Sequence, residues 1–300
     1  MKQLALAALI ALFASATANA QEAACPPAGY DRARLEALRA AEWEIADAGE
    51  RERFALALGP CLASPDPFLR DRVAYEALTR MLRAEQLSAD VRTHLTNDML
   101  ARLESADPEG FEPPFAALVL SELVRADRVN AYFTDDMRDD VSVRTAAYVA
   151  SVRDYRGFDG TEGWRHGVAH GADALMQIAL NPHFDEPAQL SAIRDAISAQ
   201  VAPEGHFYIY GESERMMRPI LFLARRGAFS EAEWTAWFEH IANPAPLESW
   251  NDAFWSQVGL AKRHNTRAFL HAVWLNARLS ENTEDDVLLP GAEAALRAIP

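Results

Sequence analysis

The amino-acid sequence predicts an all-α protein, and two observations lead to that class. Apolar residues recur at helical spacing in almost every segment, while runs of alternating β-branched residues are almost absent. Gly, Pro and capping residues divide the chain into about a dozen segments of helical length, joined by short connections. We therefore expect an irregular solenoid of two-helix repeats, similar to HEAT or armadillo proteins, with an α/α-barrel as the alternative.

The individual helices follow from the apolar periodicity and from start and stop signals. Gly49 follows the first, Asp66-Pro67 opens the third, Ser88 precedes the fourth, Pro113-Pro114 opens the fifth and Gly227 closes the ninth. Four helix pairs begin near residues 114, 164, 211 and 247, at the spacing of HEAT repeats. The predicted helices span residues 31–47, 50–58, 66–85, 89–105, 114–128, 134–152, 164–180, 187–201, 211–226, 230–242, 247–261 and 263–279.

The N-terminus has the pattern of a cleavable signal peptide over residues 1–20. Lys2 precedes an apolar run too short to span a bilayer, and Ala18-Asn19-Ala20 matches the small-residue cleavage site. We expect cleavage after Ala20 and a periplasmic or secreted protein; an N-terminal membrane anchor is the alternative. Cys25 and Cys61 are the only cysteines, and an oxidising compartment favours a disulfide bond between them over two buried thiols.

The expected domains are an N-terminal helical segment over residues 21–65, a helical-repeat domain over 66–280 and a C-terminal tail over 281–300. Without Lys2 the chain has 28 basic and 44 acidic residues, a net charge of −16. That charge argues against nucleic acid or an anionic membrane as the main partner. We expect no transmembrane segment in the mature chain, and a protein or small-molecule ligand as its partner.

The stretch GWRHGVAHGADALMQI, residues 163–178, contains the candidate site. On a helical wheel His166, His170 and Asp173 share a face opposite the apolar stripe, and Gly167 and Gly171 form a seam beside it. We expect the seam to pack against another backbone segment, the loop from Asp154 to Glu162. Two histidines four residues apart with an aspartate one turn further on are candidate ligands for one divalent metal ion. The zincin motif is excluded because Gly167 stands where its glutamate belongs.

Residues 148–182 resemble the central motif of a bacterial family known as domain of unknown function 2785. In that family a D-x-R-G segment leads into G-W-x-H-x-x-A-H-x-x-D; here Asp154, Arg156 and Gly157 lead into the histidine stretch. Further similarity lies in RDRVAYEAL at 70–78, GESER at 211–215 and NTRAFLHAVWL at 265–275, so the resemblance covers about residues 66–277. Val152 departs from the acidic residue expected at its position. The family has no established activity, so the resemblance implies a fold and a polar patch.

The polar residues of these segments complete the candidate pocket. We expect a neighbouring carboxylate to raise the pKa of the histidines. Two functions remain open: a binding or scaffold protein with a polar pocket, or a metal-dependent hydrolase using His166, His170 and Asp173. The alternative is a purely structural role, in which each polar residue caps a helix or braces a turn. The full candidate set is Asp154, Arg156, His166, His170, Asp173, Glu212, Glu214 and Arg215.

Overall fold

The computed structural model describes residues 25–300, and the expected signal peptide lies outside this range. The all-α class is confirmed, since the one sheet in the described range is a hairpin of two-residue strands. The elements are α1 (Arg32–Ala40), α2 (Ala48–Leu56), the 3-10 helix η1 (Gly59–Ala63), the π-helix η2 (Phe68–Tyr75), α3 (Glu76–Arg83), α4 (Ala89–Leu103), α5 (Glu112–Val129), α6 (Asp135–Ser151), β1 (Phe158–Asp159), β2 (Gly163–Trp164), α7 (Gly167–Leu180), α8 (Pro187–Gln200), α9 (Glu212–Arg225), α10 (Glu231–Ile241), the 3-10 helix η3 (Trp250–Trp255), α11 (Gln257–Leu279), the 3-10 helix η4 (Thr283–Leu288) and α12 (Leu289–Ala298).

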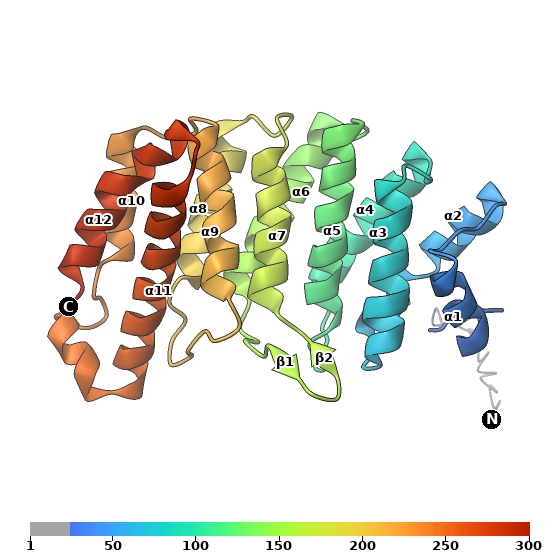
Figure 1. Cartoon of the computed structure of the whole chain (residues 1–300), viewed down its shortest axis with the longest axis horizontal. Coiled ribbons are helices and arrows are strands. Elements are labelled where there is room, and N and C mark those ends of the chain that lie inside the picture. The colour runs from blue at the N-terminus through green and yellow to red at the C-terminus, as the bar shows by residue number, and fades with distance from the viewer. Residues whose placement is uncertain (1–24) are drawn as a thin grey trace, which may run out of the picture.

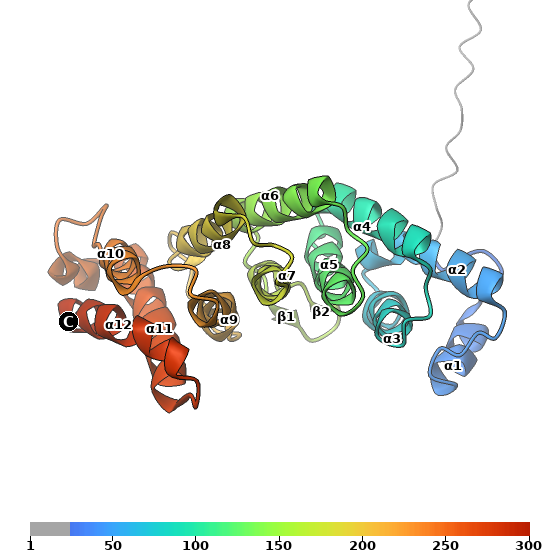
Figure 2. The same cartoon turned by 90° about the horizontal axis from the view of Figure 1, so that it is seen from above.

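The helices stand side by side in a row (Figure 1), which is curved and two layers deep when seen from above (Figure 2). Helices α4, α6 and α8 lie on the convex side, and α3, α5, α7 and α9 line the concave side (Figure 2). Helices α1 and α12 lie at opposite ends of the long axis, so the described helices do not close into the α/α-barrel considered as an alternative. Apolar side chains of both layers meet between them and form one continuous core.

Helix α7 is central to this arrangement because it packs against α5 on one side and α9 on the other. Its residues from Gly167 to Leu175 are all buried, including His170 and Asp173. The helical wheel separated an apolar stripe from a polar face, but it could not show that a neighbour covers the polar face as well. The polar face of this helix is therefore as buried as its apolar stripe.

The glycine seam of α7 packs against α6 and not against the loop from Asp154 to Glu162. A Cβ atom added to Gly171 would lie 2.5 Å from Cγ2 of Val149 and 3.2 Å from the ring of Tyr148. A Cβ on Gly167 would come within 3.2 Å of the Tyr148 hydroxyl. The glycines therefore allow the side chains of Tyr148 and Val149 of α6 to approach α7 closely. Sequence reasoning had assigned this contact to the wrong segment.

Several predicted boundaries differ from the structure. The first helix ends at Ala40, because Glu42 and Trp43 have positive φ values of 54° and 65° that stop a right-handed helix. The predicted helix over 66–85 is a π-helix followed by α3. The predicted pair 247–261 and 263–279 is a short 3-10 helix followed by the single long α11.

Residues 281–300, expected as a tail, contain η4 and α12. Leu288, Ala292, Ala295 and Ile299 recur at helical spacing and are buried. Gly291 allows α12 to approach α10, since its Cβ would lie 2.8 Å from the ring of Phe238. The segment closes the core at the C-terminal end of the row.

The predicted disulfide bond is confirmed. Cys25 and Cys61 are bonded, with their Cα atoms 5.1 Å apart, and tie the start of the described chain to η1. Over residues 25–300 no helix has both the length and the apolar character needed to cross a bilayer.

Candidate functional site

The site begins at the hairpin that precedes α7. Strands β1 and β2 pair Phe158 with Trp164, and the pairing continues as the His166 amide donates to the carbonyl of Arg156. His166 then turns the chain into α7 as the helix N-cap, with a left-handed φ of 57°. A non-glycine residue in this region is uncommon and strained, and such residues cluster at functional sites. The predicted helix over 164–180 therefore begins at Gly167 instead.

His166 and His170 still come together, with ring centroids 5.8 Å apart. The Trp164 ring stacks on His166 at 4.8 Å, and Phe115 packs edge-on against His170 at 5.2 Å. The pKa of His166 is lowered to about 4 and that of His170 to about 3, chiefly by burial and in part by the nearby Arg215 guanidinium. The expected rise in histidine pKa is wrong, because desolvation exceeds any carboxylate attraction.

Helix α9 contributes the other side of the cluster. Glu212 Oε1 lies 3.7 Å from His166 Nε2, and Glu212 Oε2 accepts a hydrogen bond from the Tyr210 amide at 2.9 Å. Burial raises the Glu212 pKa. Glu214 is exposed on the same helical turn, and the structure records no bond from it to either histidine. Of the two expected glutamates, Glu212 alone faces His166.

Asp173 lies between two arginines of α9. Arg215 is hydrogen-bonded to Asp173 Oδ2, and the Arg218 guanidinium lies 3.8 Å from Oδ1. Burial nevertheless raises the Asp173 pKa, while the two guanidiniums lower it. The predicted convergence of the 163–178 and 211–215 segments is therefore present in the structure.

Asp154 and Arg156 have a different role. Arg156 pairs with Asp154 at 2.5 Å and donates to the carbonyls of Pro108 and Glu109, so its guanidinium faces the loop before α5. The backbone of Arg156 borders the small space beside His166 and Glu212, but its charge is directed away from the histidines. The pair braces the turn, which is the structural role considered as the alternative for these residues.

Four buried polar atoms at this cluster have no hydrogen-bond partner: His166 Nε2, His170 Nδ1, Asp173 Oδ1 and Ser213 Oγ. Buried polar groups are generally hydrogen-bonded, but unpartnered buried atoms also occur elsewhere in the described chain, for example at Thr145 and Trp234, so these exceptions alone do not mark a site. The side chains at this cluster fit a metal site less well. Within residues 25–300 no three His, Cys, Asp or Glu side chains are grouped to hold a metal, and the Asp173 carboxylate faces two guanidiniums.

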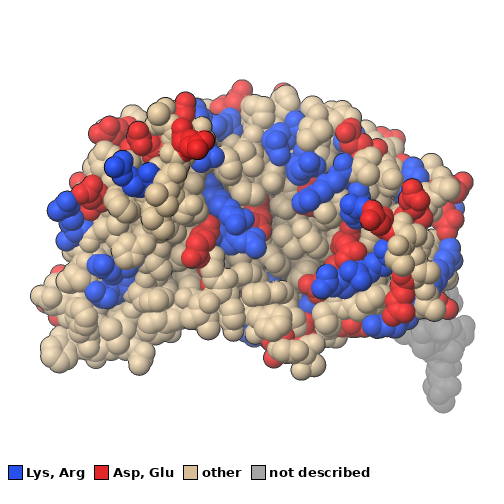
Figure 3. Space-filling model, in the orientation of Figure 1, with Lys and Arg blue, Asp and Glu red and all other residues tan. Residues whose placement is uncertain are grey.

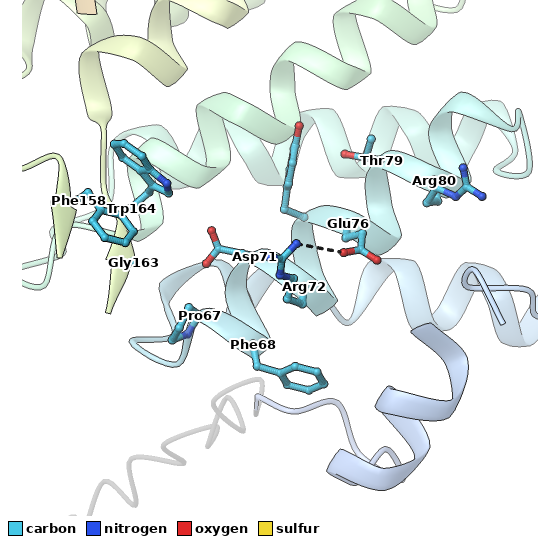
Figure 4. Close-up of a pocket in the computed structure, with 11 residues that line it drawn as sticks. Pro67, Phe68, Asp71, Arg72, Glu76, Thr79, Arg80, Phe158, Gly163 and Trp164 are labelled. Carbon is cyan, nitrogen blue, oxygen red and sulfur yellow. Dashed lines mark ion pairs between the residues drawn. The ribbon is translucent and has the colours of Figure 1, made fainter. Parts of the chain in front are cut away.

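A cavity of about 640 Å³ opens beside the hairpin. Trp164 and Phe158 lie on one side of it, and Asp71 and Arg72 on the other (Figure 4). Its full lining is Pro67, Phe68, Asp71, Arg72, Tyr75, Glu76, Thr79, Arg80, Phe158, Gly163 and Trp164. Trp164 belongs to the predicted stretch, but sequence reasoning did not identify the cavity that it lines.

The opposite wall of the cavity is built by the π-helix η2. Asp71 and Tyr75, four residues apart on this helix, lie on the same wall, and π-helical turns occur frequently at functional sites. Burial raises the pKa of both side chains. The segment RDRVAYEAL, which resembled the family motif, was the sequence signal that could have identified this wall.

Arg70 of the same π-helix joins this wall to the hairpin. It is fully buried, and its guanidinium lies over Phe111 at 4.1 Å. It donates to the carbonyl of Glu162, 92 residues away in sequence, at 2.6 Å. Gly163, with a φ of 79°, leaves room for it, since a Cβ there would lie 3.1 Å from the guanidinium. Arg70 therefore holds Trp164 in its place at the cavity.

Arginines cover buried acids across the concave face. Asp173 has 10% of its side chain exposed, while its partners Arg215 and Arg218 have 35% and 45% exposed. Glu122 on α5 repeats the pattern, with 7% exposed beneath Arg83 with 53%. Basic side chains accordingly gather at the centre of this face and extend toward α3 (Figure 3). The solvent side of these ion pairs is positive, although the whole chain is acidic.

Comparison with known proteins identifies one family and no individual relative. The sequence model of a family described as "Protein of unknown function (DUF2785)" matches residues 99–275, more than half of the chain. Searches of curated proteins and of solved structures return no match. The matched range contains the hairpin, both histidines, Asp173 and the acidic start of α9, while η2 lies before it.

Proposed function

This chain belongs to the DUF2785 family of proteins of unknown function, and we propose that it is a binding protein that takes its ligand on the concave face. The observation that carries the proposal is the cavity of about 640 Å³ between the hairpin and η2, beside the polar cluster of α7 and α9. Its size lies within the usual range for small-molecule sites. Concave surfaces of curved helical arrays serve as extended binding surfaces.

The construction of the cavity supports binding in a second way. Trp164 is 36% exposed and Phe158 is 50% exposed, so two adjacent aromatic rings face the solvent at the cavity. Aromatic rings of this kind are frequent anchors for ligands and partners. Arg70 fixes the hairpin from below, so this surface is preorganised and loses little freedom when a ligand binds.

We further propose that the row of helices is an irregular HEAT-like solenoid and that the protein is exported. The layered and curved arrangement and the sequence spacing support the first proposal. The Cys25–Cys61 bond and the signal-like N-terminus support the second. The intact mass of exported protein, with and without reductant, tests export: we expect a chain beginning at Gln21 with no free thiol, and two free thiols would contradict it.

A metal-dependent hydrolase using His166, His170 and Asp173 is the second candidate. The neutral state of both histidines near pH 7 favours it, since metals bind the unprotonated ring. Metal analysis of purified protein separates the candidates. One equivalent of zinc, manganese or iron that is lost in His170→Ala would favour the hydrolase, and metal-free protein after incubation with each ion would favour binding alone.

A fluorescence titration tests the binding proposal with a neutral aromatic probe, N-phenyl-1-naphthylamine. We expect wild-type protein to bind it, and Trp164→Ala to weaken binding about fivefold because a ring contact at the cavity is lost. Trp255→Ala is the matched control, since Trp255 is 85% exposed and outside the cavity lining. Equal binding by wild type and Trp164→Ala would contradict the proposal.

A further inference from the structure

Aromatic rings form the apolar part of the cavity at the hairpin. The ring centroids of Phe158 and Trp164 lie 5.0 Å apart, and both rings are exposed to solvent. In Figure 4 the two side chains lie together at one end of the cavity, and the Asp71 carboxylate points toward that end from η2. Covering the rings removes apolar surface from water, so the hairpin favours a ligand with an apolar face.

The charged residues that line the cavity balance one another. Asp71 and Glu76 are acids, Arg72 and Arg80 are bases, and the formal charge of the lining is therefore zero. Each of the four also lies in an ion pair with another residue of the protein. A charged ligand would find no unpaired counter-charge and would have to compete with an existing pair. The pairs are Asp71–Arg70, Glu76–Arg39, Glu76–Arg72 and Arg80–Glu42.

Two of these residues keep hydrogen-bonding capacity on the cavity side. Asp71 accepts a hydrogen bond from the buried Arg70 through Oδ2 at 2.8 Å, and 27% of its side chain is exposed. A carboxylate has lone pairs for about four hydrogen bonds, so Asp71 can accept more. Arg72 is 62% exposed, and its contact with Glu76 at 4.0 Å is longer than a hydrogen bond. Consecutive residues of η2 thus offer the cavity an acceptor and several donors.

We infer that the ligand is a neutral saccharide, whose C–H face packs on Trp164 and Phe158 while its hydroxyl groups bond to Asp71 and Arg72. A hydroxyl group both donates and accepts, so neighbouring hydroxyls of one sugar ring can bond to a carboxylate and a guanidinium together without a net charge. This inference rests on the proposed binding function of the same cavity and adds the chemical class of the ligand.

The other classes of ligand fit this lining less well. An anion would approach two carboxylates, and a cation would approach two guanidiniums, at a cavity with no charge left to neutralise. A purely apolar ligand would cover the rings but would also take Asp71 and Arg72 out of water without replacing their hydrogen bonds to it. A saccharide covers the rings and replaces those hydrogen bonds.

Competition with bound N-phenyl-1-naphthylamine tests the class of ligand. The competitors are the neutral trisaccharides cellotriose, maltotriose and N,N′,N″-triacetylchitotriose. We expect at least one of them to displace the fluorescent probe, with an affinity that does not change with salt. Sorbitol is the matched control, because it carries hydroxyl groups but has no sugar ring. Equal or stronger displacement by benzenesulfonate or phenyltrimethylammonium, or none by any trisaccharide, would overturn the inference.

Variants of the polar wall test the proposed contacts. Arg72→Met should weaken the displacing saccharide about tenfold and leave N-phenyl-1-naphthylamine unchanged, because the rings remain and the donors are lost. Arg297→Met is the control, since Arg297 is also exposed and paired with a glutamate four residues away. Asp71→Asn should weaken the saccharide too, and its unchanged binding of the neutral probe would show that the fold is intact.

The same measurements separate failure of the inference from failure of the proposed function. Saccharide binding that is unaffected by both Arg72→Met and Asp71→Asn would overturn the inference, and the cavity would still bind the neutral probe through Trp164. If neither the neutral probe nor any saccharide depended on Trp164, the proposed function itself would be overturned.

Discussion

Two buried aspartates, Asp127 of α5 and Asp173 of α7, have very different surroundings. Asp127 is fully buried and accepts hydrogen bonds from the amides of Tyr132 and Phe133 and from the side chain of Asn181, all at 2.8 Å. Asp173 is buried almost as deeply, but one of its oxygens has no partner and its arginines extend into solvent.

The difference separates a structural acid from a site acid. Asp127 holds the loop after α5 against the end of α7, and both of its carboxylate oxygens accept hydrogen bonds. Burial raises the pKa of the Asp173 carboxyl group, so keeping this group ionised lowers the folding stability. An acid retained under such conditions is typical of a functional position.

Asp127→Ala should have the largest effect on stability. The substitution leaves two backbone amides and the Asn181 amide group buried without an acceptor, which costs about 3–5 kcal/mol of unfolding free energy. Urea denaturation measures it, with Asp195→Ala as the control because Asp195 is 71% exposed. If Asp127→Ala lost no more stability than the control, Asp127 would not be a structural acid.

Acidification should have the next largest effect on folding stability, through the two buried histidines. Their folded pKa values, about 4 for His166 and about 3 for His170, lie below the ordinary 6.5, so the unfolded chain binds protons first as pH falls. Stability is then full above pH 6.5 and is lost between pH 6.5 and about 3, by on the order of 3 kcal/mol for His170 alone at pH 4.

Thermal unfolding from pH 7 to pH 4 measures this loss in wild type and in His170→Gln. We expect a shallower decline of the melting temperature with acid in the variant, because one of the two buried rings is gone. His264→Gln on α11 is the control, since His264 is exposed. Parallel declines in all three proteins would show that His170 does not carry the pH dependence.

Gly171→Leu should destabilise the protein by about 1–3 kcal/mol, because even a Cβ would lie 2.5 Å from Cγ2 of Val149. The glycine lies two residues before Asp173 in α7, so the effect measures how tightly the helix is held there. Gly160→Leu at the hairpin turn is the control, since no heavy atom lies within 4 Å of its Cβ position. Equal melting temperatures for the two variants would mean that α6 yields to the added side chain.

Asp173→Asn should have the smallest effect on stability, below about 1 kcal/mol in either direction, because burial already disfavours the charge that it removes. Asp285→Asn is the matched comparison: Asp285 is fully buried in a two-bond pair with Arg225, and we expect a loss of a few kcal/mol there. A large loss for Asp173→Asn would make Asp173 a structural acid like Asp127 and would break the comparison.

Helical spacing predicted most of the helices because each helix buries a stripe that its own sequence encodes. The pairing of Cys25 with Cys61 was predictable since no other partner exists. The family motif placed His166, His170 and Asp173 in one segment and linked it to Glu212 and Arg215. Their convergence was an expectation of that resemblance, since no single helix contains both segments.

Only the tertiary structure decided how these residues behave. The direction of the histidine pKa shifts depends on burial, which α5, α6 and α9 impose on α7 from outside its own sequence. Arg70 reaches the hairpin beside the cavity across 92 residues of sequence, and the C-terminal helix α12 packs against α10. Local periodicity determines which residues share a helical face. Segments that are distant in the chain decide what covers that face. They therefore set the protonation states of its residues and the function that these residues can have.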